Sequence, residues 1–356
     1  MSEPQEHVDT VWEQDDVDPA GVEEAMRALE RERYLRQDAA LPARALNLVT
    51  VVEAAYAGEV VRRLEATGGN APSRSILLRV EPGRERLAAR VRLAGGAGGR
   101  PGSPMHELVT FDVGRRHLSR LESIVDPVVM SDVPTLLWSP HRVPGVIDAL
   151  AALAQTVLLD SSDLDDPGEA FAAAEELAQR HDVALVDLSW LRTLPWRQRL
   201  ASAFSEPGRR ERLGAIAEVE VRHEPGSEAA AWLFLGWLGS RLGWRADRDA
   251  GAVVDRAGRS VALRPTVGRA GVVGLAGTTV TALDGTAFSL DRNPGGLRAR
   301  DHFPKEEHRA ERVWTIMGAS RGEAGVLSAA LRRTLVPDDG YGRALATARE
   351  MIGVLR

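Results

Sequence analysis

The chain contains no cysteine in its 356 residues. Disulfides, zinc ribbons, iron–sulfur clusters, thiolate nucleophiles and thiol redox switches are therefore all excluded. Proteins without disulfides are typical of reducing compartments, so we expect a cytoplasmic location. The first six residues lack the basic and apolar segments of a signal peptide, which favours the same compartment.

Lysine is nearly absent as well, because Lys305 is the only one and all other basic residues are arginines. A phosphate-binding loop places its lysine directly after glycine, whereas Lys305 follows Phe303 and Pro304. The acidic neighbours Glu306 and Glu307 favour the charged ammonium form, which is not nucleophilic. The sequence therefore predicts neither a P-loop nor a Schiff-base enzyme.

An excess of positive charge and a long apolar run are also missing. The 45 basic residues stand against 51 acidic ones, which gives a net charge of −6. Such a chain has no overall field that attracts nucleic acid or an anionic membrane surface, so neither is expected as a partner. The longest apolar run, residues 229–239, is about half the length of a membrane span and should form a buried helix.

The length predicts two domains, since one domain usually holds roughly 100–200 residues. Residues 1–20 carry seven acidic side chains and no lysine or arginine, and we expect a disordered acidic tail there. In this interpretation residues 21–205 form the first domain and residues 206–356 form the second.

Short apolar strands alternate with helical patterns through residues 21–205. The pattern predicts a helix at 21–36, then a β-α-β unit at 46–80 whose helix covers 54–66. Alternating stretches at 86–93 and 106–113 should form a hairpin around the glycine-rich segment 95–102. Further helices are expected at 117–125, 146–154 and 169–180, and further strands at 135–138, 156–159 and 183–188. Strands of this apolar kind are buried on both faces, which indicates an α/β domain with a mostly parallel, Rossmann-like sheet.

The pattern changes after residue 205 to that of a smaller α+β domain. Helix 229–242 is densely apolar, yet it contains Gly236 and Gly239, each of which costs roughly 1 kcal/mol against alanine. Close approach of another helix or strand, either from the core of this chain or from a partner subunit, is the expected compensation. The other elements expected here are a strand at 216–221, short strands up to about residue 290, a strand at 313–317 and helices at 323–335 and 341–354.

One segment matches a catalytic motif by its letters. Residues 318–322 read GASRG, the G-x-S-x-G pattern of the α/β-hydrolase nucleophile elbow. Those enzymes need a histidine after the serine to accept its proton, and the last histidine of this chain is His308. We therefore interpret Ser320 as a helix cap or turn residue and predict no catalytic residue.

The candidate ligands for metals and nucleotides have unfavourable spacing. His302 and His308 are six residues apart, which does not bring two imidazoles to one helix face. Four aspartates between residues 160 and 166 follow a predicted strand, where α/β folds place ligands. Capping of the next helix is the favoured interpretation for them, and cation binding is the alternative. No G-x-G-x-x-G follows the first strand, so we expect no dinucleotide, no other cofactor and no metal ion.

Four segments together are similar to the motifs of one known family. They are NAPSRSI at 70–76, SDVPTLLW at 131–138, DLSWLRTLPWR at 187–197 and GWLGSRLGW at 236–244. In order and spacing they resemble the glucose-6-phosphate dehydrogenase assembly protein (OpcA) family, from about residue 44 to the end of the chain. Ser139 stands where the family usually has a second tryptophan. Any cysteine-based regulation among relatives cannot operate in this chain.

The resemblance implies a non-enzymatic cytoplasmic protein that binds and activates glucose-6-phosphate dehydrogenase, the entry enzyme of the oxidative pentose phosphate pathway. A second hypothesis is a sugar-phosphate or nucleotide-binding sensor or enzyme that uses the carboxyl edge of the sheet, with Trp138, Asp160 and Ser161 at neighbouring strand ends. A thermal-shift screen with these metabolites distinguishes the two. The candidate interaction or ligand surface consists of Ser73, Arg74, Trp138, Asp160, Ser161, Trp190, Trp196 and Arg197.

Overall fold

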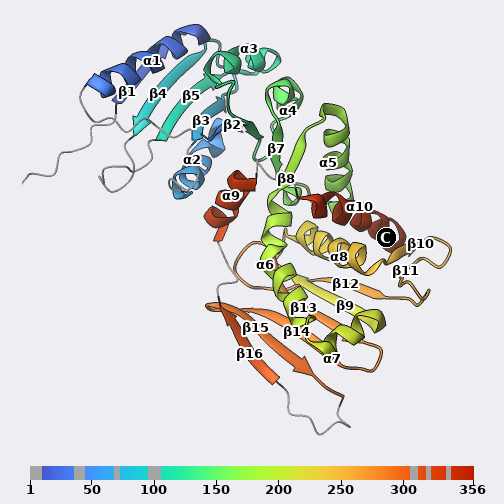
Figure 1. Ribbon diagram of the computed structural model, residues 1–356. Helices are drawn as coiled ribbons and strands as arrows, with labels where there is room; N and C mark the ends of the chain where they lie inside the picture. The colour runs from blue at the N-terminus through green and yellow to red at the C-terminus, as the bar shows by residue number, and fades with distance from the viewer. Residues whose placement is uncertain are drawn as a thin grey trace, which may run out of the picture. The chain divides into compact units, whose positions relative to one another are not determined.

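The computed structural model describes residues 10–35, 45–67, 73–94, 106–304, 312–317, 322–333 and 338–356 (Figure 1). The chain divides into two compact units. The first contains Met1–Leu159, Leu177–Val186 and Leu327–Pro337, and the second contains Asp160–Glu176, Asp187–Val326 and Asp338–Arg356. The units interleave along the chain, whereas the sequence pattern predicts a single boundary between residues 205 and 206. Residues 160–176 group with the second unit because they contact its C-terminal segment, for example through the ion pair of Glu175 and Arg349.

The first unit contains an eight-stranded sheet. Its strands are β1 (Thr10–Asp15), β2 (Leu46–Glu53), β3 (Ser73–Val80), β4 (Ala88–Ala94), β5 (His106–Val113), β6 (Thr135–Trp138), β7 (Thr156–Leu159) and β8 (Ala184–Asp187). They follow the order β1-β4-β5-β3-β2-β6-β7-β8. β2 pairs in parallel with β3 and β6, β3 with β5, and β6 with β7, whereas β4 is antiparallel to β1 and β5. The predicted α/β class with a mostly parallel sheet is confirmed.

The strands of this sheet form the main core of the first unit. Every residue of β2 from Leu46 to Val52 is buried, as expected for a strand that is covered on both faces. Ile76 of β3, Phe111 of β5 and Val157 of β7 are fully buried in the same core. The helices of this unit are α1 (Pro19–Leu35), α2 (Ala57–Ala66), α3 (Leu121–Val125) and α4 (Val146–Leu150).

The prediction of a disordered acidic tail is wrong for residues 10–20. β1 pairs with β4 at the edge of the sheet, from Thr10 opposite Leu93 to Asp15 opposite Ala88. Val17 is buried, and its amide donates to the Leu87 carbonyl oxygen at 3.0 Å. The acidic composition is compatible with this strand because the exposed Glu13 pairs with an arginine of β4 while Trp12 packs against the core. Residues 1–9 of the predicted tail lie outside the described residues.

The second unit contains a smaller, six-stranded sheet, which confirms the predicted α+β part. Its strands are β9 (Ile216–His223), β12 (Ala262–Val267), β13 (Leu275–Ala282), β14 (Ala287–Asn293), β15 (Gly296–His302) and β16 (Arg312–Met317). They follow the order β12-β9-β13-β14-β15-β16, and only the β12–β9 pair is parallel among them. A separate pair is formed by β10 (Arg245–Asp247) and β11 (Ala252–Val254). The helices are α6 (Leu188–Ala203), α7 (Pro207–Arg210), α8 (Glu228–Leu242) and α10 (Asp339–Leu355), while α5 (Pro167–His181) and α9 (Gly322–Arg333) are divided between the units.

The dense apolar helix predicted at 229–242 is α8, and it packs directly on α10 (Figure 1). A Cβ atom at Gly236 would overlap the Ala344 carbonyl oxygen and lie 2.8 Å from the Cβ of Ala348. A Cβ at Gly239 would overlap the Met351 side chain. The predicted close approach to these glycines is confirmed, and the approaching element is the C-terminal helix of the same chain. In the part of the chain that the structure describes, no helix is both long and apolar enough to cross a bilayer.

Candidate functional site

The tryptophan motif at 187–197 begins with a buried carboxyl group. Asp187 ends β8 and caps α6, because its Oδ1 accepts a hydrogen bond from the Ser189 amide at 2.8 Å. The same oxygen accepts from the Ser161 amide at 3.2 Å. Oδ2 accepts from the Ser161 hydroxyl at 2.6 Å and from the Tyr341 hydroxyl at 3.1 Å. One side chain therefore ties together the start of α6, the 3-10 turn at Ser161–Asp163 and the C-terminal helix α10.

The buried position of Asp187 changes its acidity. Burial, followed by the nearby carboxylate of Asp160, raises the pKa of Asp187 to about 6. The hydrogen bonds from Ser161 and Ser189 oppose that rise, since they stabilise the ionised form. Burial and the charge of Asp187 raise the pKa of the Tyr341 hydroxyl well above its ordinary value. Tyr341 therefore keeps its proton at neutral pH and donates a hydrogen bond to the carboxyl group.

A second polar group lies beside this carboxyl group and is centred on Arg192 of α6. The Arg192 guanidinium contacts an Asp160 oxygen at 2.7 Å and a Glu323 oxygen at 2.7 Å. Burial opposes the charge of Arg192, but the hydrogen bonds and charges of Glu323 and Asp160 outweigh it and raise the pKa of Arg192. Asp160 also accepts from the Ser189 hydroxyl at 2.6 Å. Asp160, for which the sequence favours capping and leaves cation binding as the alternative, caps the turn at Ser161–Asp163 and also neutralises a buried arginine of the same chain.

The tryptophans and Arg197 of the same motif are held in place by contacts within the chain. The Arg197 guanidinium lies 3.3 Å from the centroid of the Trp190 ring, and its Nε donates to the Thr193 hydroxyl at 2.9 Å. The Trp190 indole donates to Asp338 at 2.9 Å. Trp196 is 1% exposed. These side chains fix the conformation of α6 and hold the start of α10 against it.

The arrangement can form hydrogen bonds and ion pairs, but it does not present a reactive group. Ser161 donates to a carboxyl group, yet it is only 3% exposed and Asp187 is fully buried. A nucleophilic serine needs a base that takes its proton and an open side from which a substrate carbonyl can approach. The geometry instead satisfies each buried polar group with another one, which is the condition for a polar network that rigidifies a fold.

The remaining predicted site residues belong to the first unit. Arg74 of β3 is buried, and its guanidinium contacts Glu107 at 2.9 Å and the Val128 carbonyl oxygen at 3.0 Å. Trp138 ends β6 and is 2% exposed. Ser73 begins β3. The structure thus brings Asp160, Ser161, Trp190 and Arg197 into one cluster, with Trp196 on the same helix, and places Ser73, Arg74 and Trp138 in the sheet of the other unit.

Sequence reasoning missed several members of this cluster. Asp187 opens the recognised motif, and an aspartate between a strand and a helix is a recognisable cap signal. Arg192 lies in the same motif. Tyr341 has no such signal, because it is 154 residues away from Asp187 along the chain. Glu323 and Asp338 are equally remote in sequence from the residues that they contact.

The other residues that the sequence offers for catalysis or metal binding are Ser320, Lys305, His302 and His308. Ser320, Lys305 and His308 lie outside the described residues. His302 is 3.2 Å from the Ser289 hydroxyl. Within the described ranges, no group of three or more histidine or acidic side chains is arranged to hold a metal ion.

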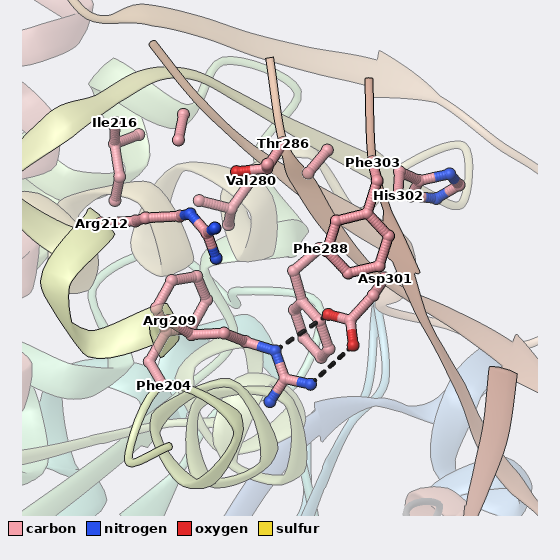
Figure 2. A pocket seen from close by; sticks show the side chains of 12 residues that line it. Phe204, Arg209, Arg212, Ile216, Val280, Thr286, Phe288, Asp301, His302 and Phe303 are labelled. Atoms are coloured by element: carbon pink, nitrogen blue, oxygen red, sulfur yellow. Dashed lines mark hydrogen bonds and ion pairs between the residues drawn. The ribbon is translucent and has the colours of Figure 1, made fainter. Parts of the chain in front are cut away.

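A small pocket in the second unit is lined by an ion pair (Figure 2). Arg209 donates to the two oxygens of Asp301 at 2.9 and 2.8 Å. Its guanidinium also lies 5.1 Å from the ring centroid of Phe288. The cavity volume is about 30 Å³, which suits one or two water molecules. A metabolite needs roughly 300 Å³ or more, so this pocket is not a substrate site.

The fold and the buried polar cluster around Asp187 and Arg192 show what class of protein this is. It is an α/β protein of two interleaved units, in which buried polar side chains join remote segments of the second unit. Residues 65–176 match the family model described as the glucose-6-phosphate dehydrogenase subunit N-terminal domain, and residues 183–345 match that of the C-terminal domain. The two matches together cover more than half of the chain. The chain belongs to the glucose-6-phosphate dehydrogenase assembly (OpcA) family.

Curated relatives agree with this assignment. The OxPP cycle protein OpcA of Nostoc punctiforme is 34% identical over 142 residues, which are 39% of this chain and 30% of the relative. The corresponding protein of Synechocystis sp. is 31% identical over 141 residues, again 39% of this chain and 30% of the relative. The matched part of this chain therefore spans less than a third of the length of these relatives.

Solved structures that align with this chain are much more distant in sequence. The 3-ketoreductase KijD10 of Actinomadura kijaniata is 13% identical, with a TM-score of 0.47 over 88% of this chain and 96% of that one. The transcriptional regulator Gal80p of Kluyveromyces lactis is 8% identical, with a TM-score of 0.48 over 90% of this chain and 94% of that one. No functional property is carried over from either protein.

Proposed function

We propose that this chain is a non-enzymatic protein that binds glucose-6-phosphate dehydrogenase and promotes its assembly or activation in the oxidative pentose phosphate pathway. The observation that carries the proposal is the match of two family models in order, each described as a domain of a subunit of that dehydrogenase. The closed cluster around Asp187 supports a role by contact, because its polar groups are used within the chain.

The proposal makes a specific demand on binding. An assembly protein raises activity only if it holds the active form of its partner more tightly than the inactive form. Each tenfold shift in the ratio of the two forms requires about 1.4 kcal/mol of differential binding. Linkage makes this effect reciprocal, so a dehydrogenase substrate that favours the active form tightens the complex by the same factor.

In this proposal the predicted surface residues of the second unit act indirectly, because they fix the position of α6. Three of these side chains are buried, namely Trp190, Trp196 and Arg197. A partner would therefore contact the exposed surface of the helix that they hold in place, and not these side chains themselves. Asp160 and Ser161 hold the start of that helix. Ser73, Arg74 and Trp138 remain candidates for a second contact area on the first unit.

Co-purification tests the binding step. The tagged full chain is expressed in its own host, and the retained proteins are compared with those of a tag-only control. The proposal predicts that glucose-6-phosphate dehydrogenase is recovered in a constant ratio to the chain after washing at physiological salt. Its absence from the eluate, with the chain itself folded, would contradict the proposal and shift support to the metabolite-sensing hypothesis.

A further inference from the structure

A cavity of about 420 Å³ opens in the first unit at the carboxyl edge of its sheet. Asp112 near the end of β5 lies opposite Ala88 at the start of β4, which in turn lies opposite Asp15 at the end of β1. The segments that leave these three strand ends line the cavity, from Asp16 to Ala20, at Arg86 and Leu87, and from Arg116 to Pro127. Carboxyl ends of parallel strands are the usual ligand-binding edge of an α/β sheet. The volume lies within the range of pockets that hold metabolites.

Two arginines on the wall of this cavity are not neutralised. Arg116 and Arg120 lie on the 3-10 helix Arg115–Arg120, their side chains are exposed, and neither forms an ion pair with any acid of the described chain. Neighbouring arginines differ in this respect. Arg84 pairs with Glu81 at 2.6 Å, and Arg86 pairs with Asp16 at 3.3 Å.

A buried histidine lies between these arginines in sequence and also lines the cavity. His117 is 2% exposed, and its Nδ1 accepts the Gly114 amide at 2.8 Å. In the neutral ring the proton is therefore on Nε2, and that N–H has no acceptor among the described residues. This atom is not among the buried unpaired side-chain atoms of the described residues, so it is accessible from the cavity and can donate to a ligand oxygen there.

The acids on the same wall cancel only part of this positive charge. Asp16 is engaged by Arg86. The Oδ1 atom of Asp18 accepts the Ala20 amide at the start of α1 at 3.2 Å. Arginine forks hydrogen-bond phosphate oxygens with matched geometry, and a phosphoryl group can accept from several donors at once.

We propose that this cavity binds a small phosphorylated molecule, whose phosphoryl oxygens accept hydrogen bonds from Arg116, Arg120 and the Nε2–H of His117. The volume leaves room for an uncharged body of about the size of a sugar beside the phosphoryl group. The site lies wholly in the first unit, and it does not depend on the proposed contact with the dehydrogenase.

The test measures binding of matched probes to the full chain. Ribose 5-phosphate, ribose and inorganic phosphate are titrated at about 0.15 M salt, where unspecific attraction between exposed charges is screened. Binding is followed by calorimetry and by NMR of histidine-labelled protein. Burial and the charges of Arg116 and Arg120 lower the pKa of His117, so a phosphoryl group at this place should raise that pKa on binding.

The expected result is saturable binding of ribose 5-phosphate and of inorganic phosphate, with ribose silent. Arg116→Gln and Arg120→Gln should each weaken binding about tenfold or more, and the double variant should abolish the response of His117. Both side chains are exposed, so the variants should fold. Arg115→Gln is the matched control, because Arg115 is an exposed neighbour that does not line the cavity. Equal binding of ribose, an equal loss in Arg115→Gln, or no binding at 10 mM probe would each overturn the proposal.

Discussion

The buried carboxyl group of Asp187 makes the stability of the chain depend on pH. Its pKa is about 6 in the fold and about 3.9 in an unfolded chain, so between these values the folded state binds more protons. The contribution of Asp187 is therefore complete well below pH 4, and it falls by about 2 kcal/mol as pH rises from 4 to 7. Asp187→Asn should remove this fall, because an amide does not ionise. Urea unfolding between pH 4 and 7 measures the difference.

The stability of the Asp187→Asn variant relative to the original chain should increase as pH rises. From pH 4 to pH 7 the unfolding free energy of Asp187→Asn should gain about 2 kcal/mol relative to the original chain. Asp182→Asn, at an exposed position on the loop before β8, controls for the loss of one acidic group. A difference between Asp187→Asn and the original chain that is constant with pH would show that this carboxyl group ionises as freely in the fold as in the unfolded chain.

Arg197 should be important for stability because, unlike most arginines on helices, it is buried. Arg197→Ala removes the stacking on Trp190 and the hydrogen bond to Thr193, and it should lower the unfolding free energy by about 2 kcal/mol or more. Arg199→Ala removes a less buried arginine from the same helix and is the matched control. Chemical denaturation of both variants shows whether Arg197→Ala loses more stability than Arg199→Ala. Equal losses would mean that the contact between Arg197 and Trp190 contributes little.

The residues of the cluster differ in how well the sequence reveals them. Trp190, Trp196 and Arg197 stand in a recognisable motif, and Asp160 and Ser161 follow a clear strand. The sequence suggests an open surface for all five, whereas the structure buries most of these side chains by pairing them with remote partners. Tyr341, Glu323 and Asp338 carry no local pattern, since their role follows only from the way the chain folds back.

The contact between α8 and α10 leaves no space for a side chain at Gly236. Gly236→Ala should lower the unfolding free energy by about 1–3 kcal/mol, because the new Cβ overlaps the backbone of α10 at Ala344. Gly236→Leu should prevent folding. Gly353→Ala is the control, since a Cβ there meets nothing within 4 Å and alanine should add about 0.5–1 kcal/mol. Thermal unfolding of the variants gives the result, and a fully stable Gly236→Leu chain would exclude this packing.

β1 should contribute to the stability of the first unit despite its acidic sequence. A chain that starts at Gly21 loses the pairing with β4 and the buried Val17, which together should cost about 2 kcal/mol or more. A chain that starts at Thr10 keeps both and is the matched comparison. Differential scanning calorimetry should show the shorter chain melting several degrees lower. Coincident transitions would restore the interpretation of residues 10–20 as a dispensable tail.

Most elements could be predicted because their signals are local. The apolar residues of β2 and the uniformly apolar α8 are visible as short patterns, and their bounds agree with the structure within a few residues. β1 was not predictable in the same way. Its acids mask a strand that is stabilised by β4, about 75 residues later, and an edge strand of this kind tolerates charged side chains on its exposed face.

The division of the whole molecule follows from contacts that are distant in sequence. The change of pattern near residue 205 predicts an α/β part followed by an α+β part, although α6 (Leu188–Ala203) already belongs to the second unit. It does not reveal that residues 160–176 group with the second unit, because that grouping rests on contacts such as those of Asp166 with Arg356 and Ser161 with Asp187. Non-local pairs of this type leave no periodicity in the sequence.

A titration of the purified chain into glucose-6-phosphate dehydrogenase of the same organism tests the central proposal most directly. NADPH formation reports activity, and light scattering reports the size of the assembly. The account predicts activation that saturates at a fixed ratio of the two proteins and a complex that substrate tightens by the same factor. No binding at micromolar concentration, together with unchanged kinetics across a range of substrate concentrations, would contradict it.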